Sequence, residues 1–214
     1  MSMYKINWQE LEKNPWEKYG GGYKTALTVG VFDGFHRGHR ALITKITEQA
    51  PVLLPVVLTF RENPKKCSFI RRPSPDKTGE GSPRDSPFED IISLDEKITL
   101  LEEWGVAFCV IIDFSENFSK IDGEGFVKAL YRYLNPGYIA VGANFHCGYR
   151  QDTGAPRFKA LAEGMGIRTE IVEPVLEGGL PVSSSRIRAA LREGRYKEAE
   201  LLLGRPLGSS LQNP

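Results

Sequence analysis

The sequence has no apolar run long enough to cross a membrane. Its longest apolar runs, such as Pro51–Phe60, reach about half of the ~20 residues that a spanning helix needs. Residues 1–17 alternate polar and charged side chains with a few apolar ones, and they lack the apolar region of a signal peptide. Only three cysteines are present, none in a CxxC pair, so a disulfide framework or a zinc ribbon is not expected. We therefore expect a cytoplasmic protein.

The chain also carries almost no net charge, with 28 lysines and arginines against 27 aspartates and glutamates. This balance argues against a protein that binds nucleic acid through bulk electrostatics. Basic residues nevertheless cluster in two segments, Arg61–Lys77 and Ser184–Arg205. Such clusters in a neutral chain suit a small polyanion such as a nucleoside triphosphate, although solvated surface charge would give the same local pattern.

Short apolar segments alternate with segments of helical period along most of the chain. The apolar segments lie at residues 26–32, 52–60, 106–112, 138–141 and 167–172. The helical segments lie at residues 39–49, 94–104, 123–134, 157–164 and 184–192. Nearly continuous apolar strands between helices are typical of a parallel sheet that is covered on both faces. The sequence therefore predicts an α/β fold with a Rossmann-like, doubly wound parallel sheet of about five strands.

Two segments interrupt this alternation. Residues 71–90 contain several prolines and glycines and almost nothing apolar, which predicts a long mobile loop. The run Gly20-Gly21-Gly22 lacks the GxxxxGK[ST] spacing of a phosphate-binding loop and is interpreted as a flexible link. We therefore expect an N-terminal extension over residues 1–22, one domain over residues 23–207 and a tail over residues 208–214.

The first apolar strand runs directly into a turn with two histidines, His36 and His39, and a helix is expected to follow. In a doubly wound sheet, ligands bind at the carboxyl ends of the strands, above helix N-termini. Imidazoles at that place can donate hydrogen bonds to phosphate oxygens, helped by the helix dipole. Gly38 lets the backbone and a phosphate approach closely, because it has no Cβ. The turn therefore predicts a phosphate-binding site.

The histidine pair has two other possible interpretations. A metal site would need further ligands, but His146 is the only other histidine and no carboxylate–histidine helix motif accompanies the pair. A bare HxxH could also be incidental. The HxGH pattern directly after a strand that ends in Gly-x-Phe-Asp-Gly is much more specific, and it favours phosphate binding.

The segment Gly30–His39 resembles the HxGH signature of the nucleotidyltransferase superfamily. Specifically, it is similar to the FMN adenylyltransferase module of bacterial bifunctional riboflavin kinase/FAD synthetases. Further matches to the motifs of that module follow in order along residues 24–207: Leu58-Thr59-Phe60 with Asn63-Pro64 (TFxPHP), Ser93–Lys97 (SLxEK), Phe114–Phe118 (FSxEF), Val141–Gly148 (VGxxFxFG), Ser183–Arg188 (SSTRIR) and Leu203–Pro206 (LLGRPY).

The serine-rich motif also has a physical reading of its own. Ser183, Ser184 and Ser185 are expected to open a helix, where hydroxyls can cap the helix while free N–H groups face an anion. Arg186 and Arg188 lie about 200° apart around that helix, so only one of them can point the same way as the cap. An ordinary serine cap with solvated arginines would give the same residues. The family resemblance implies that Ser184, Ser185 and Arg188 bind the ATP phosphates.

The resemblance also implies ATP contacts at Phe32, Asp33, Gly34 and Gly38, with Asp33 orienting the site. On the acceptor side it implies roles for Asn63, Gly142 and Asn144. Here the sequence departs from the family: Asn63 stands where the family has the histidine of Pro-His-Pro, and an amide cannot carry a charge. Ala143 stands where an acidic residue is common, and His146-Cys147 replaces a basic–aromatic pair.

The activity that the resemblance implies is the Mg²⁺-dependent transfer of AMP from ATP to FMN, which gives FAD and pyrophosphate. Such transfer needs in-line alignment and neutralisation of charge at the α-phosphate, which we expect from His36 and His39. The metal would bridge phosphate oxygens. The expected partners are the small molecules ATP and FMN, with no nucleic acid and no membrane.

Two alternatives stay open from the sequence. The acceptor could be another small phosphate, such as a phosphopantetheine- or polyol-phosphate-like compound. The chain could also be a degenerate, non-catalytic nucleotide- or flavin-binding module. A riboflavin kinase module would be expected soon after Leu207, and the sequence ends at Pro214. We therefore expect no riboflavin kinase domain in these residues.

Overall fold

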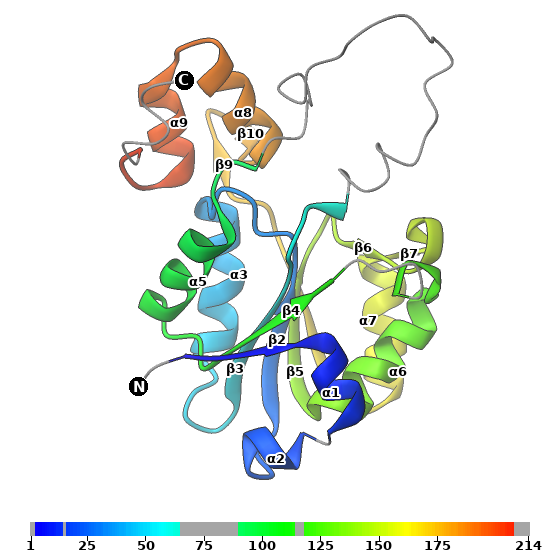
Figure 1. Cartoon of the computed structure of the whole chain (residues 1–214). Helices are drawn as coiled ribbons and strands as arrows, with labels where there is room; N and C mark the ends of the chain where they lie inside the picture. The colour runs from blue at the N-terminus through cyan, green and yellow to red at the C-terminus, as the bar shows by residue number, and fades with distance from the viewer. Residues whose placement is uncertain (1–2, 15, 65–89, 114–117, 208–214) are drawn as a thin grey trace, which may run out of the picture.

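The computed structural model describes residues 3–14, 16–64, 90–113 and 118–207. Within these residues one parallel sheet of six strands forms the centre of the molecule (Figure 1). In spatial order the strands are β1 (Tyr4–Asn7), β4 (Phe108–Ile112), β3 (Leu54–Phe60), β2 (Thr25–Val29), β5 (Pro136–Gly142) and β8 (Arg168–Val172). The predicted parallel α/β fold is confirmed, with six strands rather than about five.

Helices cover both faces of this sheet, as the nearly continuous apolar strands require. One face packs against α3 (Arg37–Thr47) and α5 (Leu94–Glu103) through residues such as Ile43 and Leu101. The other face packs against α1 (Trp8–Lys13), α6 (Gly123–Leu134) and α7 (Ala155–Gly164). Figure 1 shows α3 and α5 on one side of the sheet and α6 and α7 on the other.

The described part of the N-terminal segment belongs to the domain and is not a separate extension. Strand β1 pairs in parallel with β4 and forms the edge of the main sheet. Behind it, Trp8, Leu11 and Trp16 are buried in the core. The short helix α2 (Glu17–Gly20) ends with Gly20 directly against the Trp16 ring. Two buried tryptophans therefore tie this segment to the sheet.

A small C-terminal unit covers the carboxyl ends of the strands (Figure 1). It consists of a hairpin, β9 (Leu176–Glu177) and β10 (Leu180–Pro181), followed by α8 (Ser184–Arg192) and α9 (Tyr196–Leu203). Helix α9 was not expected from the sequence. It buries Ala199, Leu202 and Leu203 and ends at Gly204, which adopts a left-handed conformation. Its packing holds α8 above the sheet.

The remaining described elements are short. They are the 3-10 turns η2 (Phe118–Lys120) and η3 (Tyr149–Gln151) and a second hairpin of β6 (His146–Cys147) with β7 (Thr153–Gly154). The expected loop over residues 71–90 lies outside the described residues except for Asp90, and the tail over residues 208–214 lies outside them entirely. No helix in the described ranges is both long and apolar enough to span a membrane.

The strand order places a ligand-binding crevice at one point of the sheet. From the central strand β2 the chain moves outward to β3 on one side, and it later returns to β5 on the other side. In open parallel sheets this reversal leaves a crevice at the carboxyl ends of the two strands, where ligands bind. The expected HxGH turn follows β2 at this crevice, and the VGxxFxFG-like segment follows β5.

Candidate active site

The turn after β2 has an unusual backbone. Phe32 and Phe35 have φ angles of 48° and 46°, a region that bulky side chains rarely adopt. Gly34 lies between them with φ of 83°, and an added Cβ there would lie 3.0 Å from Ile91 Cδ1. Both phenyl rings are fully buried, with centroids 5.7 Å apart. The core therefore fixes a strained turn, which is a common feature of functional sites.

His36 ends this turn and caps α3. Its Nδ1 accepts the backbone N–H of His39 at 3.3 Å, so the neutral imidazole of His36 carries its proton on Nε2. The two histidine rings are stacked, with centroids 3.6 Å apart. The Nδ1 atom of His39 is buried and has no hydrogen-bond partner among the described residues. Within the described residues, the Nε2–H of His36 and the Nδ1 of His39 therefore have no hydrogen-bond partner.

Both histidines are uncharged at neutral pH. Burial, followed by the charge of Arg205, lowers the pKa of His36 to about 4. Burial also lowers the pKa of His39 well below its ordinary value, and His36 and Lys97 add to this effect. The imidazoles therefore act as neutral hydrogen-bond donors in the ligand-free protein, and they do not present a positive charge.

Asp33 joins the histidine turn to α8. Its carboxylate is 2% exposed, accepts the Ile91 N–H at 2.7 Å and forms an ion pair with Arg188. Its backbone carbonyl accepts the hydroxyl of Ser184 at 2.7 Å. Burial raises the pKa of Asp33, while the Ile91 N–H and Arg188 lower it. Asp33 thus orients two of the residues predicted to bind phosphate.

The first turn of α8 is built as the serine motif predicts. Ser183 caps the helix by accepting the Arg186 N–H at 3.3 Å, and Ser185 lies exposed in the first turn. The two arginines point in different directions. Arg188 faces Asp33, whereas Arg186 donates to the carbonyls of Glu177 and Leu180 and so holds the β9–β10 hairpin.

Gly38 lies in the first turn of α3, where the two motifs meet. A Cβ on Gly38 would lie 3.2 Å from two atoms of the His36 ring and 3.8 Å from the carbonyl oxygen of Val182, just before α8. A contact at 3.2 Å requires a shift of the neighbouring ring. The glycine therefore allows α3 and the segment before α8 to approach the His36 ring closely.

Two further residues reach the turn, although sequence reasoning gave them no role. Arg205, beyond α9, donates to the carbonyl of Phe35 at 3.1 Å. Lys97, on α5, is buried and donates to the carbonyl of Val31 at 3.2 Å. Both belong to segments that match family motifs (SLxEK and LLGRPY), and those matches are the signal that could have pointed to them.

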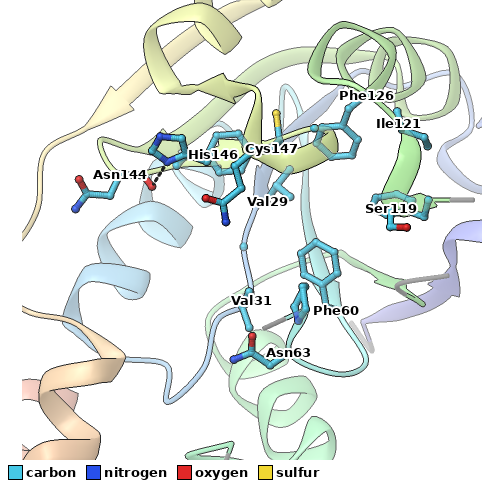
Figure 2. Close-up of a pocket in the computed structure, with 16 residues that line it drawn as sticks. Val29, Val31, Phe60, Asn63, Ser119, Ile121, Phe126, Asn144, His146 and Cys147 are labelled. Carbon is cyan, nitrogen blue, oxygen red and sulfur yellow. Dashed lines mark hydrogen bonds between the residues drawn. The ribbon is translucent and has the colours of Figure 1, made fainter. Parts of the chain in front are cut away.

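A cavity of about 440 Å³ lies beside the turn, at the carboxyl ends of β2, β3 and β5. Figure 2 shows Asn63 near Val31 and Asn144 on another side of the pocket. Of the residues predicted for the acceptor, Asn63 and Asn144 line the cavity and Gly142 does not. The Gly142 carbonyl instead accepts the Phe145 N–H at 2.9 Å and closes the turn that carries Asn144.

The lining of this cavity is aromatic and uncharged. No aspartate, glutamate, lysine or arginine is among the described lining residues, which include Phe60, Phe118, Phe126 and Phe145. The Nδ1 atom of His146 lies 3.1 Å from the backbone oxygen of Asn144 (Figure 2). Burial, followed by the charge of Asp152, raises the pKa of Cys147 to about 12, so this thiol is neutral. Such a lining suits a planar, uncharged ring with polar edges.

The residues that line the cavity lead directly into the histidine turn. Gly30 and Val31 line the cavity, and the chain continues from them directly into Phe32 and the turn. The described residues contain no cluster of three or more histidines, cysteines or carboxylates that could hold a metal ion.

Comparison with known proteins agrees with this arrangement. The bifunctional riboflavin kinase/FMN adenylyltransferase of Escherichia coli (strain K12) is 29% identical over 187 residues, covering 86% of this chain and 55% of that protein. The FAD synthetase of Listeria monocytogenes is 26% identical, covering 84% of this chain and 68% of that protein. The chain spans about half the length of most of the curated bifunctional relatives that it matches.

The fold has a close counterpart among solved structures. A crystal structure described as a macrolide-efflux protein from Streptococcus pneumoniae superposes with a TM-score of 0.72 at 28% identity, covering 96% of this chain and 72% of that one. The sequence model of a single family, described as FAD synthetase, matches residues 22–186, which include the histidine turn, the acceptor-side segment and the start of α8. On this match, which covers well over half of its length, the chain belongs to the FAD synthetase family.

Proposed function

We propose that this protein transfers AMP from ATP to FMN, forming FAD and pyrophosphate. The observation that carries the proposal is the meeting of the HxGH turn with the start of α8, beside an uncharged aromatic cavity. An enzyme that joins a nucleotide to a flavin phosphate needs both phosphate-binding groups and a cavity for the ring. Here both lie at the carboxyl edge of the sheet. The family membership supports the same reaction.

In this reaction a phosphate oxygen of FMN attacks the α-phosphorus of ATP, and the bond from that phosphorus to the bridging oxygen of the β-phosphate breaks. Negative charge builds up on the α-phosphate oxygens in the transition state. His36 meets this charge with its Nε2–H. The proton of the neutral ring lies on Nε2 because Nδ1 accepts a backbone N–H. His39, stacked on His36, supplies the second imidazole.

The leaving pyrophosphate is assigned to α8. Ser184, Ser185 and Arg188 lie in its first two turns, where free N–H groups and the helix dipole favour an anion. Arg188 lies beside Asp33, with which it forms an ion pair, and its planar guanidinium group suits a phosphate. Mg²⁺ bound to the ATP phosphates supplies charge neutralisation there.

The acceptor ring is assigned to the aromatic cavity. The phenyl rings offer a surface for stacking, and the amides of Asn63 and Asn144 can hydrogen-bond the polar edge of an isoalloxazine. A polyol phosphate or a phosphopantetheine has no planar ring to use such a lining, so the cavity favours FMN over these acceptors. The intact histidine turn and serine cap favour an enzyme over a non-catalytic binding module.

The direct test is incubation of the purified chain with ATP, Mg²⁺ and FMN, followed by chromatographic separation of FAD. We expect FAD and pyrophosphate in equal amounts. Riboflavin is the matched control because it lacks the attacking phosphate, and it should yield no adenylylated product. The absence of FAD with FMN, together with product from a ring-free phosphate, would replace FMN by that acceptor. We place the reaction in the cytoplasm, in line with the free thiols of Cys109 and Cys147.

A further inference from the structure

Lys97 is the only buried lysine among the described residues, with an exposed fraction of 2%. It lies in the first half of α5, whose start is fixed by a capping box between Ser93 and Glu96. The Ser93 hydroxyl accepts the Glu96 N–H at 3.2 Å, and the Glu96 carboxylate accepts the Ser93 N–H at 2.8 Å. Burial of an ammonium group is expensive unless it has polar partners, so the groups around Lys97 bear on its role.

The ammonium group of Lys97 points at the histidine turn. Its Nζ donates to the carbonyl of Val31 at 3.2 Å, one residue before the left-handed Phe32. The segment just before α5 holds the same turn at two other points. The Ile91 N–H donates to Asp33 at 2.7 Å, and the Ile91 side chain packs against Gly34. Three contacts from residues 91–97 therefore hold a turn whose backbone is strained.

The charge of Lys97 also acts on the site. It lowers the pKa of His39 and, with Arg188, it lowers the pKa of Asp33. Four charged groups from different parts of the described chain act on His36, His39 and Asp33. They are Asp90, Lys97, Arg188 and Arg205. Of the two groups that act on His39, His36 is itself uncharged at neutral pH, which leaves Lys97 as the charged one.

We propose that Lys97 is a positioning residue for nucleotidyl transfer, whose buried ammonium group holds the Val31 carbonyl and thereby the turn that presents His36 and His39. This inference rests on the proposed function, because it assigns the two imidazoles to the α-phosphate. Lys97 acts through the backbone and through His39, so it is not a catalytic residue. Its loss changes the alignment of the histidines and the charge around them while the nucleotide-binding groups of α8 remain.

The test compares three variants of the full chain. Lys97→Met removes the charge and the donor, and Lys97→Gln removes the charge but keeps a donor for the Val31 carbonyl. Lys128→Met is the control, because Lys128 is an exposed lysine on α6 that pairs with Glu124. Circular dichroism and thermal melting identify the folded variants. If Lys97→Met does not fold, Lys97→Gln supplies both readouts below.

The first readout is a histidine titration by NMR without substrates. The chain has only three histidines, so their signals can be assigned by substitution. We expect the titration midpoint of His39 to rise in Lys97→Met and Lys97→Gln and to stay unchanged in Lys128→Met. A folded Lys97 variant whose His39 midpoint is the same as in the original chain would overturn the charge effect.

The second readout is the FAD-forming reaction. We expect kcat to fall about 10- to 100-fold in Lys97→Met, with KM for ATP changed less than about threefold, because misalignment acts on the transition state. Lys97→Gln should lose less than Lys97→Met. A folded Lys97→Met with kcat within twofold of the original chain would overturn the positioning role. If the original chain forms no FAD, the proposed function fails, and the NMR titration still decides whether the charge of Lys97 acts on His39.

Discussion

Replacement of Gly38 by alanine should raise stability and lower activity at the same time. Gly38 lies in the first turn of α3 and its φ is not in the left-handed region, so alanine is allowed by the backbone. Alanine is favoured over glycine in a helix by up to about 1 kcal/mol, and by less near the N-terminus. We take a gain of about 0.5 kcal/mol, from which the cost of moving the His36 ring is subtracted, so the rise in Tm for a domain of this size is at most about 1–2 °C.

The new methyl group acts on the catalytic histidine. It would lie 3.2 Å from the Cε1 and Nδ1 atoms of His36, so the imidazole must move by a few tenths of an ångström. It also fills the space in which a phosphate would approach the start of α3. Small displacements of catalytic groups reduce rates strongly, and we expect kcat to fall about 10- to 100-fold.

Gly164→Ala provides the matched control. Gly164 lies within α7, far from the turn in the sequence, and an added Cβ there meets no atom within 4 Å. This variant should show a similar small rise in Tm with unchanged kcat. Differential scanning calorimetry and the FAD assay measure both quantities. Full turnover in Gly38→Ala would refute the close approach of phosphate to α3, and a fall in activity in both variants would point to a general effect of lost glycine.

Three further predictions concern the same site. His36→Ala should lower kcat by about 10²–10³-fold with a smaller change in ATP binding, whereas Asn144→Ala should mainly raise KM for FMN. Steady-state kinetics of both variants tests this difference, and normal turnover in His36→Ala would refute it. Arg188→Met should weaken ATP binding in a calorimetric titration. Arg186→Met should chiefly lower Tm, because Arg186 holds the β9–β10 hairpin through two carbonyls and pairs with Glu198. The reverse pattern would refute the assignment. Because the pKa of His36 falls from 6.5 to about 4 on folding, its stabilising contribution is fully present above pH 6.5 and is lost as the pH falls toward 4. Urea unfolding at these two pH values should show a loss of about 2–3 kcal/mol in the free energy of unfolding. This loss should be smaller in His36→Asn, and an equal loss in the variant would contradict the low pKa.

The elements with strong apolar periodicity could be predicted from the sequence. The helices over residues 123–134 and 184–192 have the expected bounds, and five of the six sheet strands lie within or next to their expected apolar segments. Strand β1 gave no such signal, because in Tyr4–Asn7 only Ile6 is buried at this sheet edge. Helix α9 lacks a side-chain cap at Arg195, which removed the usual start signal.

The site could be predicted only in part. The HxGH turn and the serine cap are local patterns, so both were recognisable in the sequence. The role of Asp33 in orienting Ser184 and Arg188 depends on contacts across more than 150 residues, and no local pattern predicts such a contact. The burial of Lys97 is likewise decided by where α5 packs against the turn. The acceptor-side role of Gly142 stays a prediction, and in the structure its carbonyl accepts the Phe145 N–H.

The link between Asp33 and α8 has a consequence for how this protein matures during synthesis. A ribosome releases the histidine turn long before it releases Ser184 and Arg188, which are the partners that neutralise and orient Asp33. Until then the Asp33 carboxylate lacks the arginine with which it pairs in the folded domain. The nucleotide-binding groups therefore come together only after nearly all of the domain has been made, and a chain interrupted before α8 has no complete phosphate site.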